Sequence, residues 1–121
     1  MANEIALNAS LTFKKNGVEE SLSKTSSITV SGKRCIRHVQ NIGTSEEAMV
    51  IGELATLGYC MIRNMDSTNY VEIRSGTGTA NFMKLKAGES AGPFRFGSGA
   101  TAPYAIANTA AVDIEYLIIE D

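Results

Sequence analysis

The stretch that decides the fold runs from Leu57 to Glu89. It contains the alternating run Gly58-Tyr-Cys-Met-Ile-Arg-Asn64, the polar connector Met65-Asp-Ser-Thr68 and a second alternating run, Asn69-Tyr-Val-Glu-Ile-Arg74. A third run, Asn81-Phe-Met-Lys-Leu-Lys-Ala-Gly-Glu89, follows a loop rich in Gly and Thr. Alternation with a period of two, broken by turn residues every eight to twelve positions or so, is typical of β-sandwiches and jelly rolls. The stretch therefore predicts an all-β fold.

The residues before this stretch continue the β pattern. Between residues 4 and 14, five apolar residues alternate with mainly polar ones: Ile5, Leu7, Ala9, Leu11 and Phe13. This predicts a strand with one face in the core and the other in water. The Asn16-Gly17 pair accepts positive φ and predicts a hairpin or tight turn. Shorter β-rich runs follow at residues 26–30 and 33–42.

The segment from Thr44 to Gly58 fits two different structures. Thr44-Ser-Glu-Glu47 matches a capping box and Gly58 matches a helix C′ position, which together would make a helix. Gly52, however, costs a helix about 1 kcal/mol relative to Ala, and residues 48–51 would serve as a short buried strand. We favour a strand followed by a loop and keep the helix as the alternative.

The last apolar run, residues 112–120, is apolar on both faces in its second half. Ile114, Tyr116 and Ile118 point one way, and Leu117 and Ile119 point the other way. Such a strand is either central in its sheet or lies at a subunit contact.

These runs give eight or nine strands. We predict a single antiparallel β-sandwich or jelly-roll-like domain over residues 1–121, in which residues 1–14 are a first strand or an extended N-terminal arm.

Composition excludes several classes of function. The 121 residues are 44% hydrophobic and 20% charged, and the net charge of −2 provides no basic surface for nucleic acid or for an anionic membrane. No apolar run approaches the ~20 residues that span a bilayer. The N-terminal residues lack the features of a signal peptide, which favours a cytoplasm-like compartment or export by a route other than a cleaved signal. Without such a leader, we expect Cys35 and Cys60 to be reduced, buried thiols.

Residue types that could carry catalysis are present, but their pattern predicts structural roles. His38 is the only histidine, and its odd spacing from Cys35 places the two side chains on opposite faces of a strand. The acidic side chains, among them Glu53, Glu72, Glu89 and Glu115, are scattered singly and form no acid/base pair. We therefore predict no enzyme activity and no cofactor.

Three further motifs have a binding and a structural interpretation. The oxygen-bearing residues 66–69 would suit a hard cation, but Asp, Ser and Asn more often cap turns, here in a hairpin connector. Gly76-Thr-Gly-Thr-Ala80 lacks the Lys and the helix of a phosphate loop and predicts a flexible turn. Tyr59, Tyr70 and Tyr104 could stack on sugars, although strand tyrosines usually pack into the core.

Three of these segments together resemble a family of small β-sandwich proteins of tailed-bacteriophage virions. The similarity spans roughly residues 26–119 and is carried by residues 58–73, 82–89 and 109–119. Its most specific parts are the Asn64-x-Asp66-x-x-Asn69-Tyr70 connector and the Leu85-Lys-Ala-Gly-Glu89 turn. The resemblance concerns strand and turn positions, so it transfers no functional residue.

The resemblance implies a structural component of the virion, assembled in the bacterial host cytoplasm. Capsid decoration or cement proteins of this size clamp neighbouring capsomers as oligomers, and related sandwiches serve in tails, collars and fibres. We accordingly expect a homotrimer or other homo-oligomer that binds the major capsid protein or other virion proteins and neither nucleic acid nor membrane. The alternative is a tail, collar or fibre component that binds a receptor or glycan. The expected interface residues are Ile5, Leu7, Leu11, Phe13, Leu117 and Ile119.

Overall fold

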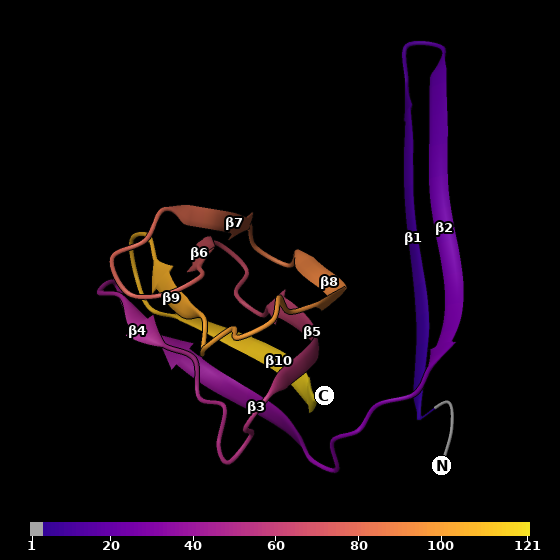
Figure 1. The fold of residues 1–121 in the computed structure, drawn as a ribbon. Helices are drawn as coiled ribbons and strands as arrows, with labels where there is room; N and C mark the ends of the chain where they lie inside the picture. The colour runs from indigo at the N-terminus through magenta and orange to yellow at the C-terminus, as the bar shows by residue number, and fades with distance from the viewer. Residues whose placement is uncertain (1–3) are drawn as a thin grey trace. The chain divides into compact units, whose positions relative to one another are not determined.

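The computed structural model describes residues 4–121, which form strands and loops and contain no helix (Figure 1). The prediction of an all-β, sandwich-like protein is confirmed. The chain divides into two compact units, one reaching to Ser31 and the other comprising residues 32–121. The second unit is the sandwich, and the first is a separate β-hairpin.

The hairpin pairs β1 (Ile5–Lys15) with β2 (Val18–Ile28) in antiparallel register. The turn predicted at Asn16-Gly17 is confirmed: both residues have positive φ, 52° and 80°, as a tight hairpin turn requires. Residues 1–14 were expected to form a first strand or an extended arm. Their described part belongs to β1, which pairs with β2 in the hairpin, and residues 1–3 lie outside the described residues. The sequence did not predict the beginning of β2, because residues 18–25 are mainly polar.

The sandwich contains eight strands, each paired antiparallel to its neighbours. They are β3 (Cys35–Ile42), β4 (Glu47–Ala48), β5 (Leu57–Asn64), β6 (Val71–Arg74), β7 (Asn81–Leu85), β8 (Ser90–Arg95), β9 (Tyr104–Ala107) and β10 (Val112–Glu120). One sheet has the order β3-β10-β5-β8, and the other has the order β4-β9-β6-β7. The described residues thus have ten strands, against the eight or nine expected from the sequence.

Strand pairing in the sandwich is nested. The outermost strands in sequence, β3 and β10, pair with each other, and inside them β4 pairs with β9, β5 with β8 and β6 with β7. Consecutive strands β5 and β6 therefore lie in different sheets, and residues 65–70 cross from one sheet to the other. The expectation that these residues connect a hairpin is wrong, since local alternation does not show which strand will be the neighbour.

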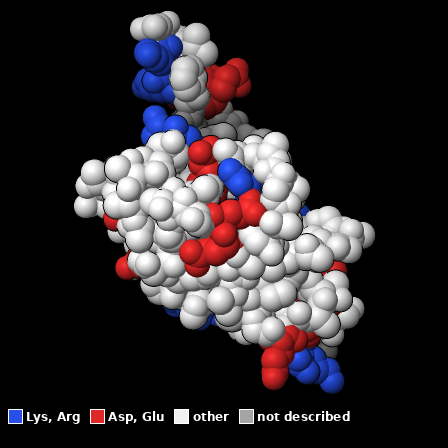
Figure 2. Space-filling view, turned by 90° about the vertical axis from the view of Figure 1, so that its left-hand side faces the viewer, with Lys and Arg blue, Asp and Glu red and all other residues white. Residues whose placement is uncertain are grey.

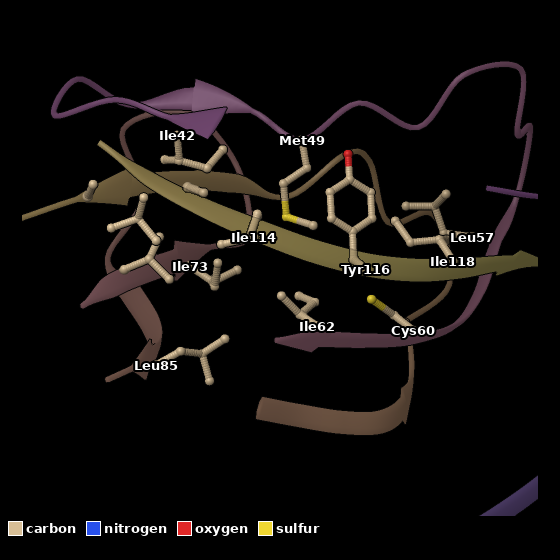
Figure 3. Close-up of a cluster of buried hydrophobic side chains, with 14 of the residues drawn as sticks. Ile42, Met49, Leu57, Cys60, Ile62, Ile73, Leu85, Ile114, Tyr116 and Ile118 are labelled. Carbon is tan, nitrogen blue, oxygen red and sulfur yellow. The ribbon is translucent and has the colours of Figure 1, made fainter. Parts of the chain in front are cut away.

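A single hydrophobic core joins the two sheets (Figure 3). Ile62, Ile114 and Ile118 of one sheet and Val71 and Ile73 of the other are buried in it. The Tyr116 ring also lies in the core, where its hydroxyl donates to the carbonyl of Val50 at 2.6 Å. Burial raises the pKa of Tyr116 to about 12. Strand β10 lies between β3 and β5 and is therefore central in its sheet. This was the first of the two positions expected for a strand that is apolar on both faces.

The ambiguous segment, residues 44–58, forms the two-residue strand β4 and a loop that leads into β5. The preferred strand and loop are confirmed, and the helix does not form. Gly52 has a φ of +60°, which is incompatible with a right-handed helix. Met49 and Leu54 instead point apolar side chains into the core from the loop.

Candidate functional site

The hairpin has one apolar and one polar face. On the apolar face, Leu11 lies opposite Leu22, Phe13 opposite Glu20 and Lys15 opposite Val18. The other face carries Ser, Thr and Asn pairs and the opposed charges Lys14 and Glu19. Strand alternation makes both faces continuous over about the whole length of β1.

The apolar face is uncovered over most of its length. Leu11 and Leu22 are 75% and 78% exposed, and Phe13 and Val18 are also exposed. Burying a side chain of this kind stabilises a protein by about 1.5–3 kcal/mol. Since an isolated two-stranded hairpin is at best marginally stable in water, this face is the strongest candidate for a contact with a partner.

Four expected interface residues, Ile5, Leu7, Leu11 and Phe13, share this face. This side of the strand was expected to face the core. The expectation is wrong for Leu11 and Phe13, which are exposed, whereas Ile5 is buried and Leu7 is half-buried. Val18 and Leu22 on β2 were not predicted as interface residues. Their even spacing beyond the Asn16-Gly17 turn, with polar residues at positions 19, 21 and 23 on the other side, was the signal that could have found them.

The second candidate surface is the outer face of the sheet around β10. Leu117, which is exposed, lies between Arg37 on β3 and Met61 on β5. Beside them, Glu115 lies between Val39 and Arg63. A shallow hollow of about 180 Å³ forms over this area. Leu117 and the half-buried Ile119, the two remaining expected interface residues, both belong to this face, far along the sequence from the hairpin residues.

Charges on this outer face are matched within the chain. Glu115 accepts from Arg63 Nε at 2.6 Å and from Arg37 Nη2 at 3.1 Å. Hydrogen bonds first from Arg63 and then from Arg37 lower the pKa of the Glu115 carboxyl. The face therefore presents Val39, Met61 and Leu117 as apolar groups around an ionic cluster in which one carboxylate pairs with two guanidinium groups.

A groove of about 650 Å³ opens between the edge strands β7 and β8. Its walls are mainly apolar and include Phe82, Met83, Phe94 and Phe96. Two charged side chains line this groove, and both are paired: Arg74 with Glu46 at 2.6 Å and Arg95 with Asp121 at 2.7 Å. The groove suits apolar side chains of another molecule better than a polar substrate.

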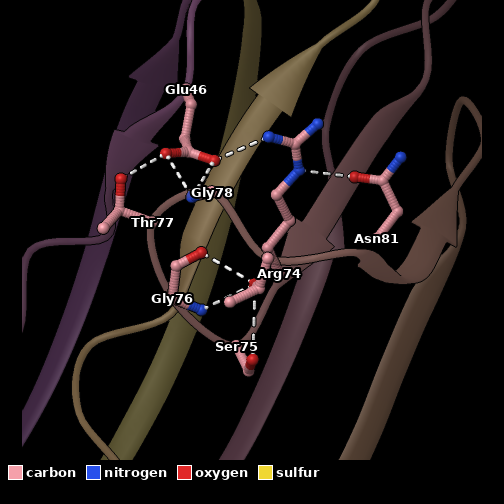
Figure 4. A network of polar contacts seen from close by, with 8 residues as sticks. Glu46, Arg74, Ser75, Gly76, Thr77, Gly78 and Asn81 are labelled. Atoms are coloured by element: carbon pink, nitrogen blue, oxygen red, sulfur yellow. Dashed lines mark hydrogen bonds and ion pairs between the residues drawn. The ribbon is translucent and has the colours of Figure 1, made fainter.

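The glycine-rich loop at residues 76–79 binds a carboxylate of its own chain (Figure 4). Glu46 accepts from Thr77 Oγ1 at 2.6 Å, from the Gly78 N–H at 3.0 and 3.1 Å, and from Arg74 Nη1 at 2.6 Å. These donors, first Thr77 and then Arg74, lower the pKa of Glu46. The groups that resembled part of a phosphate loop are therefore used to attach this loop to the segment before β4.

The oxygen-rich segment at residues 66–69 caps its own turn. Asp66 Oδ2 accepts from the N–H groups of Thr68 and Asn69 at 2.9 and 2.6 Å, and the bond from Asn69 is the larger cause of the lowered pKa of Asp66. The buried Asn64 donates to the carbonyls of Asn69 and Leu85 and accepts from the Asp66 N–H. The described residues contain no group of three or more acidic, His or Cys side chains placed to hold a metal ion.

The two cysteines differ in burial, and Cys35 lies on the opposite side of β3 from His38. Cys35 is exposed, so its expected burial is wrong, whereas Cys60 is buried and has its pKa raised to about 12 by burial. Both are free thiols. His38 faces inward, with its ring 5.9 Å from that of Tyr116 in an edge arrangement, while Cys35 lies on the outer side of β3. The predicted opposite orientation of these two side chains is confirmed.

The tyrosines proposed as a sugar platform lie apart. Tyr59 is on β5 with the Arg95 guanidinium 4.6 Å from its ring, and Tyr70, before β6 in the other sheet, has Lys84 Nζ at 4.0 Å. Tyr104 is half-buried on β9. The glycan-binding alternative gains no support from this arrangement, because two of the three rings already stack with cations of the same chain.

On the face that Figure 2 shows, acidic side chains gather near the centre, with a basic side chain beside them. Within residues 4–121, no helix is long and apolar enough to cross a membrane. Comparisons with protein-family models, with curated proteins and with solved structures find no match to this chain.

Proposed function

We propose that this protein is a non-enzymatic structural protein of a bacteriophage virion, most specifically a capsid decoration protein that oligomerises and binds the capsid surface. The observation that carries the proposal is the amphipathic hairpin, whose apolar face is uncovered from Leu11 to the turn. A face of this kind is of use to a protein that works by adhesion.

The strand order of the sandwich supports the same function. The nested pairs β3–β10, β4–β9, β5–β8 and β6–β7 support a jelly-roll interpretation, in which a long ribbon of paired strands winds into two sheets. Jelly rolls are frequent in viral capsid proteins and lectins. This support is an analogy of fold, and it adds to the resemblance of residues 26–119 to phage virion proteins.

Binding to the shell would use the outer face of the sandwich around β10. Val39, Met61 and Leu117 supply exposed apolar area, and the cluster of Arg37, Arg63 and Glu115 supplies hydrogen-bonding groups at its centre. Modest contacts of this kind become strong when an oligomer engages several symmetric positions at once. Adhesion would then depend on area and symmetry rather than on any reactive side chain.

The first test is the composition of the particle. Virions purified from the phage that carries this gene should contain the chain at a copy number that matches symmetric positions of the shell, measured by quantitative mass spectrometry. Purified virions without the chain would overturn the proposal.

The second test is rebinding to particles that lack the chain. Met61→Glu places a charge on the outer face and should weaken binding about tenfold or more. Met65→Glu is the matched control, because Met61 and Met65 are 45% and 47% exposed and Met65 lies in the connector after β5. Equal weakening by both variants, or by neither, would contradict the use of this face.

A further inference from the structure

On the apolar face of the hairpin, the residues on the turn side of the centre complement those on the other side in size and charge. Its centre is the level of Leu11 and Leu22. The next level towards the turn carries a large residue and an acid, Phe13 and Glu20. The next level away from the turn carries a small residue and a base, Ala9 and Lys24. Turning a second hairpin end for end therefore brings unlike residues together.

We propose that two copies of this chain pair through this face, in antiparallel orientation, about a twofold axis that crosses the strands at the level of Leu11 and Leu22. In this arrangement β1 lies over β1 of the second copy, β2 lies over β2 of the second copy, and the two hairpin turns point in opposite directions. The contact is isologous and closes at two subunits. It has the form of two aligned sheets packed face to face at about 10 Å.

Charge selects this orientation. The twofold axis places Glu20 over Lys24 of the second copy and, by symmetry, Lys24 over Glu20 of the second copy. If the axis instead ran along the strands, each level would meet the same level of the second copy, with β1 over β2. Glu20 would then lie over Phe13 of the second copy, and Lys24 over Ala9. Both charges would then be covered by apolar groups without an opposite charge, which is costly. The antiparallel pairing gives each of them one.

Side-chain volume agrees with the same orientation. Phe13 lies over Ala9 of the second copy, so the largest side chain of β1 on this face meets the smallest one. Leu11 and Leu22 meet their own counterparts at the axis. One level further out, the aliphatic stem of Lys15 covers Leu7 of the second copy while its ammonium group reaches water. The bulkiest side chain of the face, Phe13, thus meets no second large side chain.

The inference rests on the proposed function, because it names the partner through which an adhesive protein would oligomerise. It also separates two surfaces by role: the hairpin joins two copies, and the outer face of the sandwich around β10 binds the shell. A pair of outer faces on one dimer would supply the multiple attachment that raises binding strength.

Sedimentation equilibrium of the purified full-length chain tests the partner. The expected mass is twice the 12.9 kDa of one chain at concentrations of tens of micromolar. The double variant Leu11→Ser, Leu22→Ser should sediment as a single chain. A wild-type mass of one chain or of three chains would overturn the proposal, as would a double variant that remains dimeric.

Charge reversal tests the orientation without removing apolar surface. Glu20→Lys places like charges together twice per dimer and should raise the dimer dissociation constant about tenfold or more. Adding Lys24→Glu to this variant should restore most of the lost affinity. The matched control is Glu19→Lys, which makes the same change of net charge on the polar face and should leave the mass unchanged. A failed rescue, or an equal effect of the control, would reject the antiparallel register.

These outcomes are separable from those of the proposed function. A monomeric chain that is present in virions would reject the hairpin dimer and leave the virion role standing. A chain that is dimeric but absent from purified virions would leave the hairpin dimer standing and reject the virion role.

Discussion

The hairpin and the sandwich use the same alternation of apolar and polar residues but differ in what happens to the apolar face. In the sandwich, Ile114 and Ile118 on β10 are fully buried against the opposite sheet. In the hairpin, Leu11 and Leu22 occupy equivalent alternating positions and are about three-quarters exposed. The first pair stabilises the fold of its own unit, and the second pair is available for a partner.

This difference separates folding from assembly within one short chain. Residues 32–121 have two sheets that cover each other, so the apolar faces between these sheets are used within the unit. The hairpin has a single layer, and a single layer leaves one apolar face to water unless another molecule covers it. Changes in the two regions should therefore affect different measurements.

The largest difference should appear when one apolar side chain is truncated in each region. Ile114→Ala leaves a cavity between the sheets and should lower the free energy of unfolding by about 2–5 kcal/mol. Leu22→Ala should change it by no more than about 0.5 kcal/mol, as for other exposed sites. Urea titration followed by tyrosine fluorescence measures this, because all four tyrosines lie in the sandwich unit. Equal losses would mean that hairpin and sandwich unfold as one unit.

A smaller difference should follow from removing one asparagine in each region. Asn64→Ala takes hydrogen bonds from the buried carbonyl of Leu85 and from Asn69, and it should lower the free energy of unfolding by about 1–3 kcal/mol. Asn8→Ala, on the exposed polar face of the hairpin, is the control and should be close to neutral. The same titration compares them; a neutral Asn64→Ala would show that water replaces these bonds.

The smallest effect should be that of acid on the sandwich. Glu46 and Glu115 have pKa values lowered below the ordinary 4.5 by donors within the sandwich. A carboxyl with a lowered folded pKa contributes its full stabilisation above its unfolded pKa and loses it as the pH falls through the folded value. The urea midpoint should therefore decrease as the pH falls below about 4.5, and Glu46→Gln should make this decrease shallower. A midpoint that rises on acidification would contradict the sign.

Local sequence predicted much of the fold. Alternation placed Ile114, Tyr116 and Ile118 on the same face, and the Asn16-Gly17 pair predicted the hairpin turn through its positive φ values. Gly52 argued against a helix before β5, and its φ of +60° agrees. Each of these features depends on residues within a few positions of one another, so a single sequence contains the necessary information.

The candidate site was predicted only in part. Leu11 and Phe13 were expected at an interface, yet the apolar residues of β2 on the same face, Leu22 and Val18, were missed because a polar strand gives a weak signal. Met61 and Val39 were not predicted as part of the surface around Leu117, for another reason. They join Leu117 on one surface only because β5 and β3 both pair with β10, and those pairings link residues more than 50 positions apart.

The sequence by itself determined which side of each strand a residue would take, because the period of two is a property of the extended backbone. Tertiary structure alone decided which of those sides would be covered. Leu11 and Ile114 look alike in the sequence, but only Ile114 has a second sheet above it, since strand partners and sheet packing arise from contacts between distant residues.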